Sequence, residues 1–246
     1  MNLIVDIGNT LVKSALLERG RVVEEHADGA FCPEAVARLL DRGRVRRAIL
    51  SSTRGEMPEV AAWLRERVSS LLLFTPQTPV PIRNVYRTPQ TLGRDRLAAA
   101  VGATVLFPGR NVLIVDFGTA VTIDLVTADA TYRGGCISPG VQLRFGALHD
   151  HTAALPLCRP SDEEGLQGLT TEEAVTRGVM NSVAFEIEGY IRRMEAQIDG
   201  LCVIFTGGDA KYFAKRIKNT IFASCNLVYC GLERILEYNA SEEYLD

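Results

Sequence analysis

Residues 3–10 read Leu3-Ile4-Val5-Asp6-Ile7-Gly8-Asn9-Thr10, and residues 113–120 repeat the pattern as Leu113-Ile114-Val115-Asp116-Phe117-Gly118-Thr119-Ala120. In each copy a short apolar run ends in an aspartate, a glycine follows two residues later, and a second β-rich run comes next. Apolar runs bounded by a glycine turn predict a strand, a tight turn and another strand. Because the two copies lie so far apart in the chain, the repeat indicates two related structural units.

The segments after each copy follow the same order, in which a β-meander is succeeded by helices and further strands. In the first half we expect helices at 33–42, 56–69 and 95–107 and strands at 48–52 and 71–74. In the second half we expect β-structure over 111–133, a long helix from about 171 to 197, a strand over 201–205, and helices after Gly208 and Gly231. This order, given twice, is the pattern of actin-like (ribonuclease H-like) domains. We therefore predict an α/β protein with two duplicated domains, 1–108 and 109–246, and a cleft where the two Asp-Gly turns meet.

The composition excludes several classes of protein. Of the 246 residues, 47% are hydrophobic and 23% are charged, which is the balance of a globular chain, and the formal net charge is −3. Without a basic excess, neither nucleic acid nor an anionic membrane is expected as a partner. The N-terminus does not read as a signal peptide, and no apolar run approaches membrane-spanning length. Six cysteines without any Cys-x-x-Cys spacing favour a reducing cytoplasm.

The first Asp-Gly turn carries groups that suit phosphate chemistry. Asp6 stands at a strand end, Gly8 is free to adopt a positive φ, and the backbone N–H groups that follow can face a phosphate. The aspartate can hold a magnesium ion, directly or through water, while Lys13 offsets charge on a transferring phosphoryl group. An Asp-x-Gly turn also serves as an ordinary hairpin corner, but two matched copies favour the functional interpretation.

The segment Thr91-Leu92-Gly93-Arg94-Asp95-Arg96 leads into the expected helix at 95–107. An aspartate here can cap the helix, where the helix dipole favours a negative charge. The same carboxylate, held ionised by its arginine neighbours, could instead take a proton from a substrate hydroxyl, leaving an arginine for a substrate carboxylate. The chemistry alone leaves both interpretations open.

Three further motifs lie in the second half. The second Asp-Gly turn, with Asp116, is expected to bind phosphates or a cation. Gly134 to Gly140 is expected to form a glycine-rich turn into a helix, and Thr206-Gly207-Gly208-Asp209 to form a loop at a strand end beside the nucleotide. Thr170 and Glu173 have the spacing of a capping box, so Thr171 is either a bystander of that cap or a donor to the substrate.

Taken in order, the motifs Asp-x-Gly-Asn-Thr, Gly-Arg-Asp-Arg, Asp-x-Gly-Thr-Ala-x-Thr, Gly-Gly-x-Ile-x-Pro-Gly and Thr-Gly-Gly-Asp-Ala resemble those of the type III pantothenate kinases. The resemblance covers nearly the whole chain, from Asn2 to about Leu236. It implies the fold of the acetate and sugar kinase, Hsp70 and actin superfamily, with ATP bound in the interdomain cleft. It further implies phosphorylation of the primary hydroxyl of pantothenate, the first committed step to coenzyme A, by a cytoplasmic homodimer.

The resemblance also implies roles for individual residues. Asp95 would be the general base, Asp116 would bind a monovalent cation, K⁺ or NH₄⁺, and Asp6 would bind Mg²⁺. The ATP-binding residues would be Asp6, Ile7, Gly8, Asn9, Thr10, Leu11, Val12, Lys13 and Thr119. The pantothenate-binding residues would be Tyr86, Gly93, Arg94, Asp95, Arg96 and Thr171, with Arg96 as the partner of the substrate carboxylate.

Two other functions fit part of the pattern. A kinase of the same superfamily that acts on a sugar or a short-chain acid would keep both Asp-Gly turns, but has no particular need for Gly93 to Arg96. A catalytically silent homologue would be expected to lose an acidic site residue, whereas this chain keeps Asp6, Asp95 and Asp116.

Overall fold

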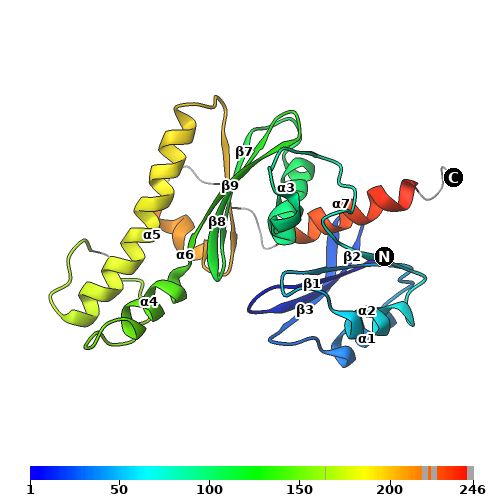
Figure 1. The fold of residues 1–246 in the computed structure, drawn as a ribbon, viewed down its shortest axis with the longest axis horizontal. Coiled ribbons are helices and arrows are strands. Elements are labelled where there is room, and N and C mark those ends of the chain that lie inside the picture. Colours follow the sequence, from blue (N-terminus) through cyan, green and yellow to red (C-terminus); the bar gives the residue numbers. More distant parts are fainter. Residues whose placement is uncertain (164, 218–220, 223–225, 243–246) are drawn as a thin grey trace. The chain divides into compact units, whose positions relative to one another are not determined.

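The computed structural model describes residues 1–163, 165–217, 221–222 and 226–242. The chain forms two compact units (Figure 1). The first unit comprises Met1–Gly109, Val126–Gly134 and the described residues of the C-terminal segment, and the second comprises Arg110–Leu125 and the described residues of 135–224. Compactness therefore groups the C-terminal helix with the first half of the chain.

The sheet of the first unit is built around the strand that carries the first Asp-Gly turn. Its order is β3 (Arg21–Asp28), β2 (Val12–Glu18), β1 (Asn2–Ile7), β4 (Arg47–Ser52) and β5 (Ser70–Leu73). Strand β1 is antiparallel to β2 and parallel to β4. Helices α1 (Pro33–Asp41) and α2 (Pro58–Arg65) each begin with a proline, whose missing N–H costs nothing in a first turn. Their apolar faces share one core with β1 and β4.

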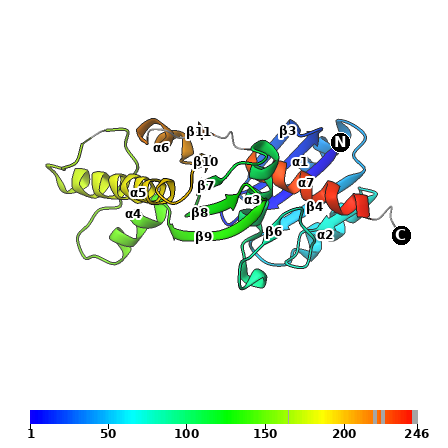
Figure 2. The ribbon, with the colours of Figure 1, turned by 90° about the horizontal axis from the view of Figure 1, so that it is seen from above.

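The second sheet repeats this order. It runs β11 (Ile221–Phe222), β10 (Cys202–Gly207), β7 (Val112–Phe117), β8 (Ala120–Thr127), β9 (Thr131–Pro139) and finally β6 (Arg83–Asn84). Read from β9 to β11, its strands correspond one to one with β3-β2-β1-β4-β5. The parallel pairing of β7 with β10 matches that of β1 with β4. The predicted α/β class with two duplicated actin-like arrangements is confirmed by this match, and Figure 2 shows β7, β8 and β9 side by side.

Three helices accompany the second sheet: α4 (Val141–Asp150), the long α5 (Thr171–Glu195) and α6 (Ala210–Arg216). Aromatic rings join the sheet to α6, because the Phe117 ring stacks on Phe213 at a centroid distance of 4.7 Å and meets the Phe205 ring edge-on at 4.9 Å. Phe117 is thereby fixed in the core directly after Asp116, so the second Asp-Gly turn starts from a rigid strand end.

In the first unit, α3 (Arg94–Leu106) and α7 (Leu227–Glu242) lie against each other, as both ribbon views show, and α3 is preceded by a short 3₁₀ turn, η1 (Pro89–Thr91). Glycines make their contact unusually close. A Cβ on Gly102 would lie 2.1 Å from the Leu227 carbonyl oxygen, and one on Gly231 would lie 1.8 Å from that of Ala98. The two backbones therefore touch directly.

Some expected elements are wrong in extent. Helix α7 begins at Leu227 rather than after Gly231, because that glycine serves the helix contact and not a helix start. Gly134 and Gly135 lie within strand β9 and not in a turn; of this motif only Gly140 directly precedes a helix. The cysteines of the described residues are free thiols, as expected, and Cys225 lies outside those residues. Within the described part of the chain, no helix combines the length and the apolar character needed to cross a membrane.

Candidate active site

Asp6 lies near the carboxyl end of the central strand β1, with only 8% of its surface exposed. In the antiparallel register its Cα faces that of Lys13, and in the parallel register that of Ser51. The turn after it is closed by a hydrogen bond from the Gly8 N–H to the Leu11 carbonyl, 3.0 Å long. Asp6, the turn and Lys13 are thus brought together as the sequence predicts.

The side chains around this turn divide into two groups. Asn9, Thr10 and Leu11 are exposed, whereas Ile7 and Val12 are buried and belong to the core. The predicted ATP contacts of Ile7 and Val12 would therefore have to come from their backbone atoms.

The electrostatic surroundings of Asp6 are unusual for a surface hairpin. Burial, and to a smaller extent the nearby Asp95 carboxylate, raise the pKa of its carboxyl group to about 6, while Ser51 and Lys13 oppose the rise. Asp6 Oδ1 and Ser51 Oγ are both buried and lack a hydrogen-bond partner of good geometry among the described residues, although Ser51 lies near enough to lower the Asp6 pKa. A buried, orphaned carboxylate oxygen is costly unless something pairs with it. A purely structural hairpin turn does not require a buried carboxylate oxygen without a partner.

Asp95 lies in the first turn of α3, two residues beyond the N-cap position. The helix begins at Arg94 with Gly93 as its N-cap residue, and Asp95 Oδ1 accepts a hydrogen bond from the Arg96 N–H at 2.8 Å. One carboxylate oxygen thus satisfies a helix-terminal amide, which fixes the orientation of the acid. A Cβ on Gly93 would lie 2.6 Å from Asp95 Oδ1, so only glycine leaves this carboxylate where it is.

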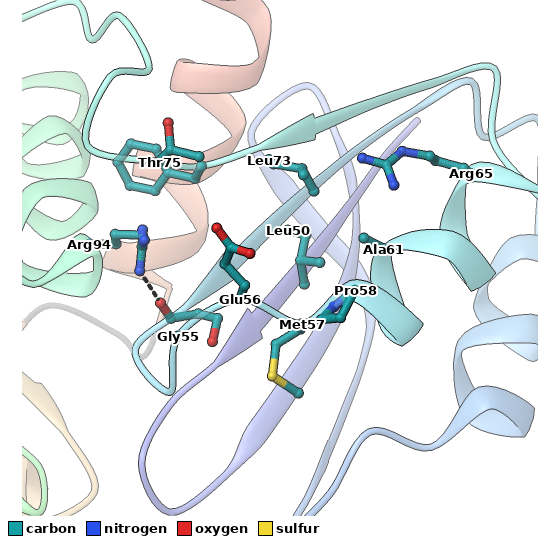
Figure 3. A pocket seen from close by; sticks show the side chains of 12 residues that line it. Leu50, Gly55, Glu56, Met57, Pro58, Ala61, Arg65, Leu73, Thr75 and Arg94 are labelled. Carbon is teal, nitrogen blue, oxygen red and sulfur yellow. Dashed lines mark hydrogen bonds between the residues drawn. The ribbon is translucent and has the colours of Figure 1, made fainter.

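Arg94 lies at the start of α3 and contacts the end of β4. Its Nη1 donates to the carbonyl oxygen of Ser52 at the end of β4, 2.5 Å away, and its Nε is buried without a partner among the described residues. It lines a cavity of about 280 Å³ whose opposite wall carries Arg65 from α2 (Figure 3). The hydrogen bond from Arg94 to Ser52 therefore ties the start of α3 to β4.

Arg96 and Tyr86 lie together on another side of α3. The Arg96 guanidinium is 5.9 Å from the centroid of the Tyr86 ring, and only 6% of Arg96 is exposed. The Tyr86 ring also approaches the buried Tyr132 ring at 6.3 Å, and a Cβ on Gly134 would lie 3.4 Å from it. Tyr86, Arg96 and Asp95 thus gather in the first unit, and Gly134 gives the tyrosine room.

A segment that was not predicted from the sequence, Ser52-Thr53-Arg54 after β4, joins these groups. Its contacts reach α3 through Ser52 and the first Asp-Gly turn through the other two residues. One available signal was the parallel pairing of β1 and β4, since the carboxyl ends of parallel strands meet at the same sheet edge. Residues just beyond β4 were therefore candidates for the site.

In the second unit, glycines surround Asp116 and its turn. Gly207 has a φ of +93°, and a Cβ there would lie 2.4 Å from Asp116 Oδ1. A Cβ on Gly140 would lie 2.3 Å from the Gly118 carbonyl oxygen and 2.5 Å from that of Thr119. The motifs containing Gly140 and Gly207 therefore meet at the second Asp-Gly turn. Thr119 is exposed beside them.

Thr171 is not part of the helix cap. Thr170 is the N-cap residue of α5, and its side chain accepts a hydrogen bond from the Glu173 N–H at 3.2 Å. The exposed Thr171 lines a largely apolar groove of about 1020 Å³ between α4 and α5, with residues such as Leu143 and Val179. Thr171 is thus a bystander of the cap, as one of the two interpretations held, and its role as a donor to the substrate stays a prediction.

At the acids of this site, a metal ion would take ligands from a substrate or from water as well as from side chains. Among the described residues no three His, Cys, Asp or Glu side chains are grouped as a metal site. Mg²⁺ commonly uses one or two carboxylates together with phosphates and water, and the orphaned Asp6 Oδ1 fits that pattern. Beside Asp116, the backbone of Gly207 packs so closely that a Cβ there would lie 2.4 Å from Asp116 Oδ1, and this packing fixes the acid at the strand end.

Residues 2–193 match the family of type III pantothenate kinases. The chain belongs to that family. A type III pantothenate kinase from Phocaeicola vulgatus is 41% identical over 239 residues, which cover 97% of this chain and 99% of the relative. The family assignment implied by the ordered motifs is confirmed, because similarity at this level extends over the whole pattern.

Solved structures resemble this type III pantothenate kinase family member in fold at low sequence identity. A Baf family protein from Campylobacter jejuni has a TM-score of 0.63 at 19% identity, covering 97% of this chain and 99% of its own. A protein from Sinorhizobium meliloti named for 2-dehydro-3-deoxygalactonokinase has a TM-score of 0.59 at 13% identity, with the same coverage. At these identities the likeness concerns the fold alone, and it agrees with the duplicated strand order.

Proposed function

We propose that this protein transfers the γ-phosphoryl group of ATP to the primary hydroxyl of pantothenate, forming 4'-phosphopantothenate in the first step of coenzyme A biosynthesis. The observation that carries the proposal is the pair of acids Asp6 and Asp95, placed close enough for Asp95 to raise the pKa of Asp6. One acid has a buried oxygen without a partner, and the other is oriented by a helix amide. Phosphoryl transfer needs two such acids in different roles, one toward the phosphates and one toward the nucleophile.

In this mechanism Asp95 accepts the proton of the pantothenate hydroxyl as it attacks in line. Its Oδ1 accepts a hydrogen bond from the Arg96 N–H, which orients the carboxylate for this role. The turn from Gly8 to Thr10 directs backbone N–H groups at the phosphates, and Lys13 adds positive charge. When bound at Asp6, Mg²⁺ supplies charge neutralisation for the β- and γ-phosphate oxygens. Most of the rate comes from positioning and electrostatics.

For the acceptor we propose that Tyr86, Gly93 and Arg96 bind pantothenate, with Thr171 as a further donor. The cluster of Tyr86, Arg96 and Asp95 supports this assignment. Arg94 belongs to the same proposed site, since its Nη1 donates to Ser52 while its buried Nε has no partner among the described residues. Because Arg96 is largely buried, its guanidinium offers a substrate carboxylate a preorganised partner.

We further propose a K⁺ or NH₄⁺ site at Asp116, with Thr119 contacting ATP. Support comes from the close packing of Gly207 against Asp116 Oδ1, which holds this carboxylate in a fixed position at the strand end. Cytoplasmic residence, homodimer formation and duplicated domains at 1–108 and 109–246 belong to the same proposal. The matched strand order supports the duplication, and the apolar groove between α4 and α5 is a surface of the kind that subunit contacts cover.

The test is ATP-dependent phosphorylation of pantothenate by the purified protein with Mg²⁺, comparing K⁺, NH₄⁺ and Na⁺ as the single monovalent cation. We expect turnover in K⁺ or NH₄⁺ and little in Na⁺. Equal turnover in all three would remove the cation site while leaving the kinase assignment intact. No turnover of pantothenate, together with turnover of a sugar or short-chain acid, would favour another kinase of the superfamily. Light scattering of the same sample measures whether it is a dimer.

A further inference from the structure

The residues just after β4 hold the first Asp-Gly turn by its carbonyl groups. The Thr53 N–H and hydroxyl both donate to the Ile7 carbonyl, at 2.9 and 3.2 Å. Arg54 Nε donates to the Gly8 carbonyl at 2.7 Å, and its Nη2 donates to the Asn9 carbonyl at 3.1 Å. Three consecutive carbonyl groups of the turn are thus bound by one dipeptide.

Arg54 is itself held in place. Its N–H donates to the Ser52 hydroxyl at 3.1 Å, and its Nη2 also reaches the Gly29 carbonyl at 3.5 Å. A guanidinium presents its donors in a rigid planar fork, so binding two adjacent carbonyls fixes the angle between their peptide planes. A more flexible or shorter side chain could not do both.

Fixing these carbonyls also fixes the amides of the turn. In a planar trans peptide, the C=O of one residue and the N–H of the next point in opposite directions. When the carbonyls of Gly8 and Asn9 face Arg54, the N–H groups of Asn9 and Thr10 must face away from it. These are the amides that the proposed function directs at the ATP phosphates.

We propose that Arg54 is a positioning residue of the kinase: it holds the turn so that the Asn9 and Thr10 amides are presented to the nucleotide phosphates before ATP binds. This inference rests on the proposed function, because it takes the turn to be the phosphate site. Turn residues without such a clamp would have to be ordered on binding, at a cost in affinity. Arg54 acts through the turn, from the side opposite to the amides.

The test measures binding of a non-hydrolysable ATP analogue with Mg²⁺ by calorimetry, and the KM of each substrate, in the wild type and in Arg54→Ala and Arg54→Lys. For Arg54→Ala we expect the Kd and the KM for the nucleotide to rise about tenfold, the effect of about one hydrogen bond. The KM for pantothenate and the melting temperature without nucleotide should stay unchanged. Arg54→Lys should remain several-fold weaker than the wild type, because an ammonium lacks the planar fork.

Arg42→Ala is the matched control, since it removes an exposed arginine of the same unit that pairs with Glu24 at 2.7 Å. Nucleotide binding by Arg54→Ala at wild-type affinity would overturn the inference. Full recovery in Arg54→Lys would also overturn it, in favour of a direct charge contact with phosphate. A wild-type protein that binds no nucleotide would instead defeat the proposed function. Faster hydrogen exchange at the Gly8 amide, whose N–H closes the turn on the Leu11 carbonyl, would report the loosened turn in Arg54→Ala independently of activity.

Discussion

Asp95, in the first turn of α3, raises the pKa of Asp6, at the end of β1, although the larger cause of that rise is the burial of Asp6 itself. The two acids therefore form one electrostatic unit. Because the pKa of Asp6 lies at about 6 in the folded protein, against its ordinary value of 3.8, the ionised form of Asp6 is destabilising at neutral pH. An enzyme that keeps such a charge buried needs it for a ligand.

The first prediction concerns stability. As the pH falls through about 6, the folded protein takes up a proton at Asp6 that the unfolded chain takes up only near 3.8, so this destabilisation disappears between those values. Asp6→Asn should therefore raise the free energy of unfolding at pH 7.5 by on the order of 2 kcal/mol in the absence of ligand. The gain should vanish near pH 4. Denaturant titrations at both pH values measure it.

The control for this experiment is Asp41→Asn, which neutralises an exposed aspartate at the end of α1. It should change stability by only a few tenths of a kcal/mol at either pH, roughly the size of surface effects. A loss of stability in Asp6→Asn at pH 7.5 would mean that the pairing of Asp6 with Lys13 outweighs the cost of burial.

The second prediction concerns catalysis. Asp95→Asn removes the proton acceptor but keeps a side-chain oxygen for the Arg96 N–H, so the fold and ATP binding should persist. Turnover should fall by about 10²–10⁴-fold, the usual contribution of a general base. Steady-state kinetics and a calorimetric nucleotide titration on one preparation measure both. A variant that retains near-normal turnover would remove Asp95 from the base role.

The third prediction tests the glycine before the base. In Gly93→Ala the new methyl group would meet Asp95 Oδ1 at 2.6 Å, so the carboxylate must turn away from its position. Because small misplacements of a catalytic group are costly, kcat should fall by on the order of a hundredfold while nucleotide affinity is retained. Unchanged kcat would show that the position of this carboxylate is not critical.

Features that recur in the sequence, and residues with unusual sequence neighbours, could be predicted from the sequence. The two Asp-Gly turns and their flanking strands could be predicted because apolar runs, aspartate and glycine occur in the same order twice. Asp95 could be singled out because a glycine and two arginines flank it. The duplicated strand order then followed from the repeat, and the structure confirms it.

What the sequence could not predict depends on contacts between distant segments. Gly231 looks like a helix start, yet it is a mid-helix contact with Ala98 that only tertiary packing reveals. The Nη1 of Arg94 donates to a strand-end carbonyl that lies far away in the sequence. Arg54 belongs to no recognisable motif. Its role depends on the Gly8 carbonyl in the turn after β1, which lies beside the end of β4.

The fourth prediction concerns the proposed cation. Gly207→Ala puts a methyl group 2.4 Å from Asp116 Oδ1 and forces a positive φ on alanine, so it should displace that carboxylate. Activation by K⁺ over Na⁺ should be reduced at least about tenfold, as for a lost charge-assisted contact. Rates across a K⁺ titration measure this. Gly208→Ala, where nothing lies within 4 Å, is the neighbouring control and should respond normally to K⁺.

The last prediction concerns the contact between α3 and α7. In Gly231→Ala the methyl group would lie 1.8 Å from the Ala98 carbonyl oxygen, a backbone atom that cannot swing aside, so the helices must separate. Overpacking of this kind costs about 1–3 kcal/mol or more, and we expect the upper end. Gly189→Ala in α5, with nothing within 4 Å, should instead gain about 0.5–1 kcal/mol from lower backbone entropy in the unfolded chain. Denaturant unfolding of both variants separates the two effects. Equal stability of the two would mean that the helices do not touch at these glycines in solution.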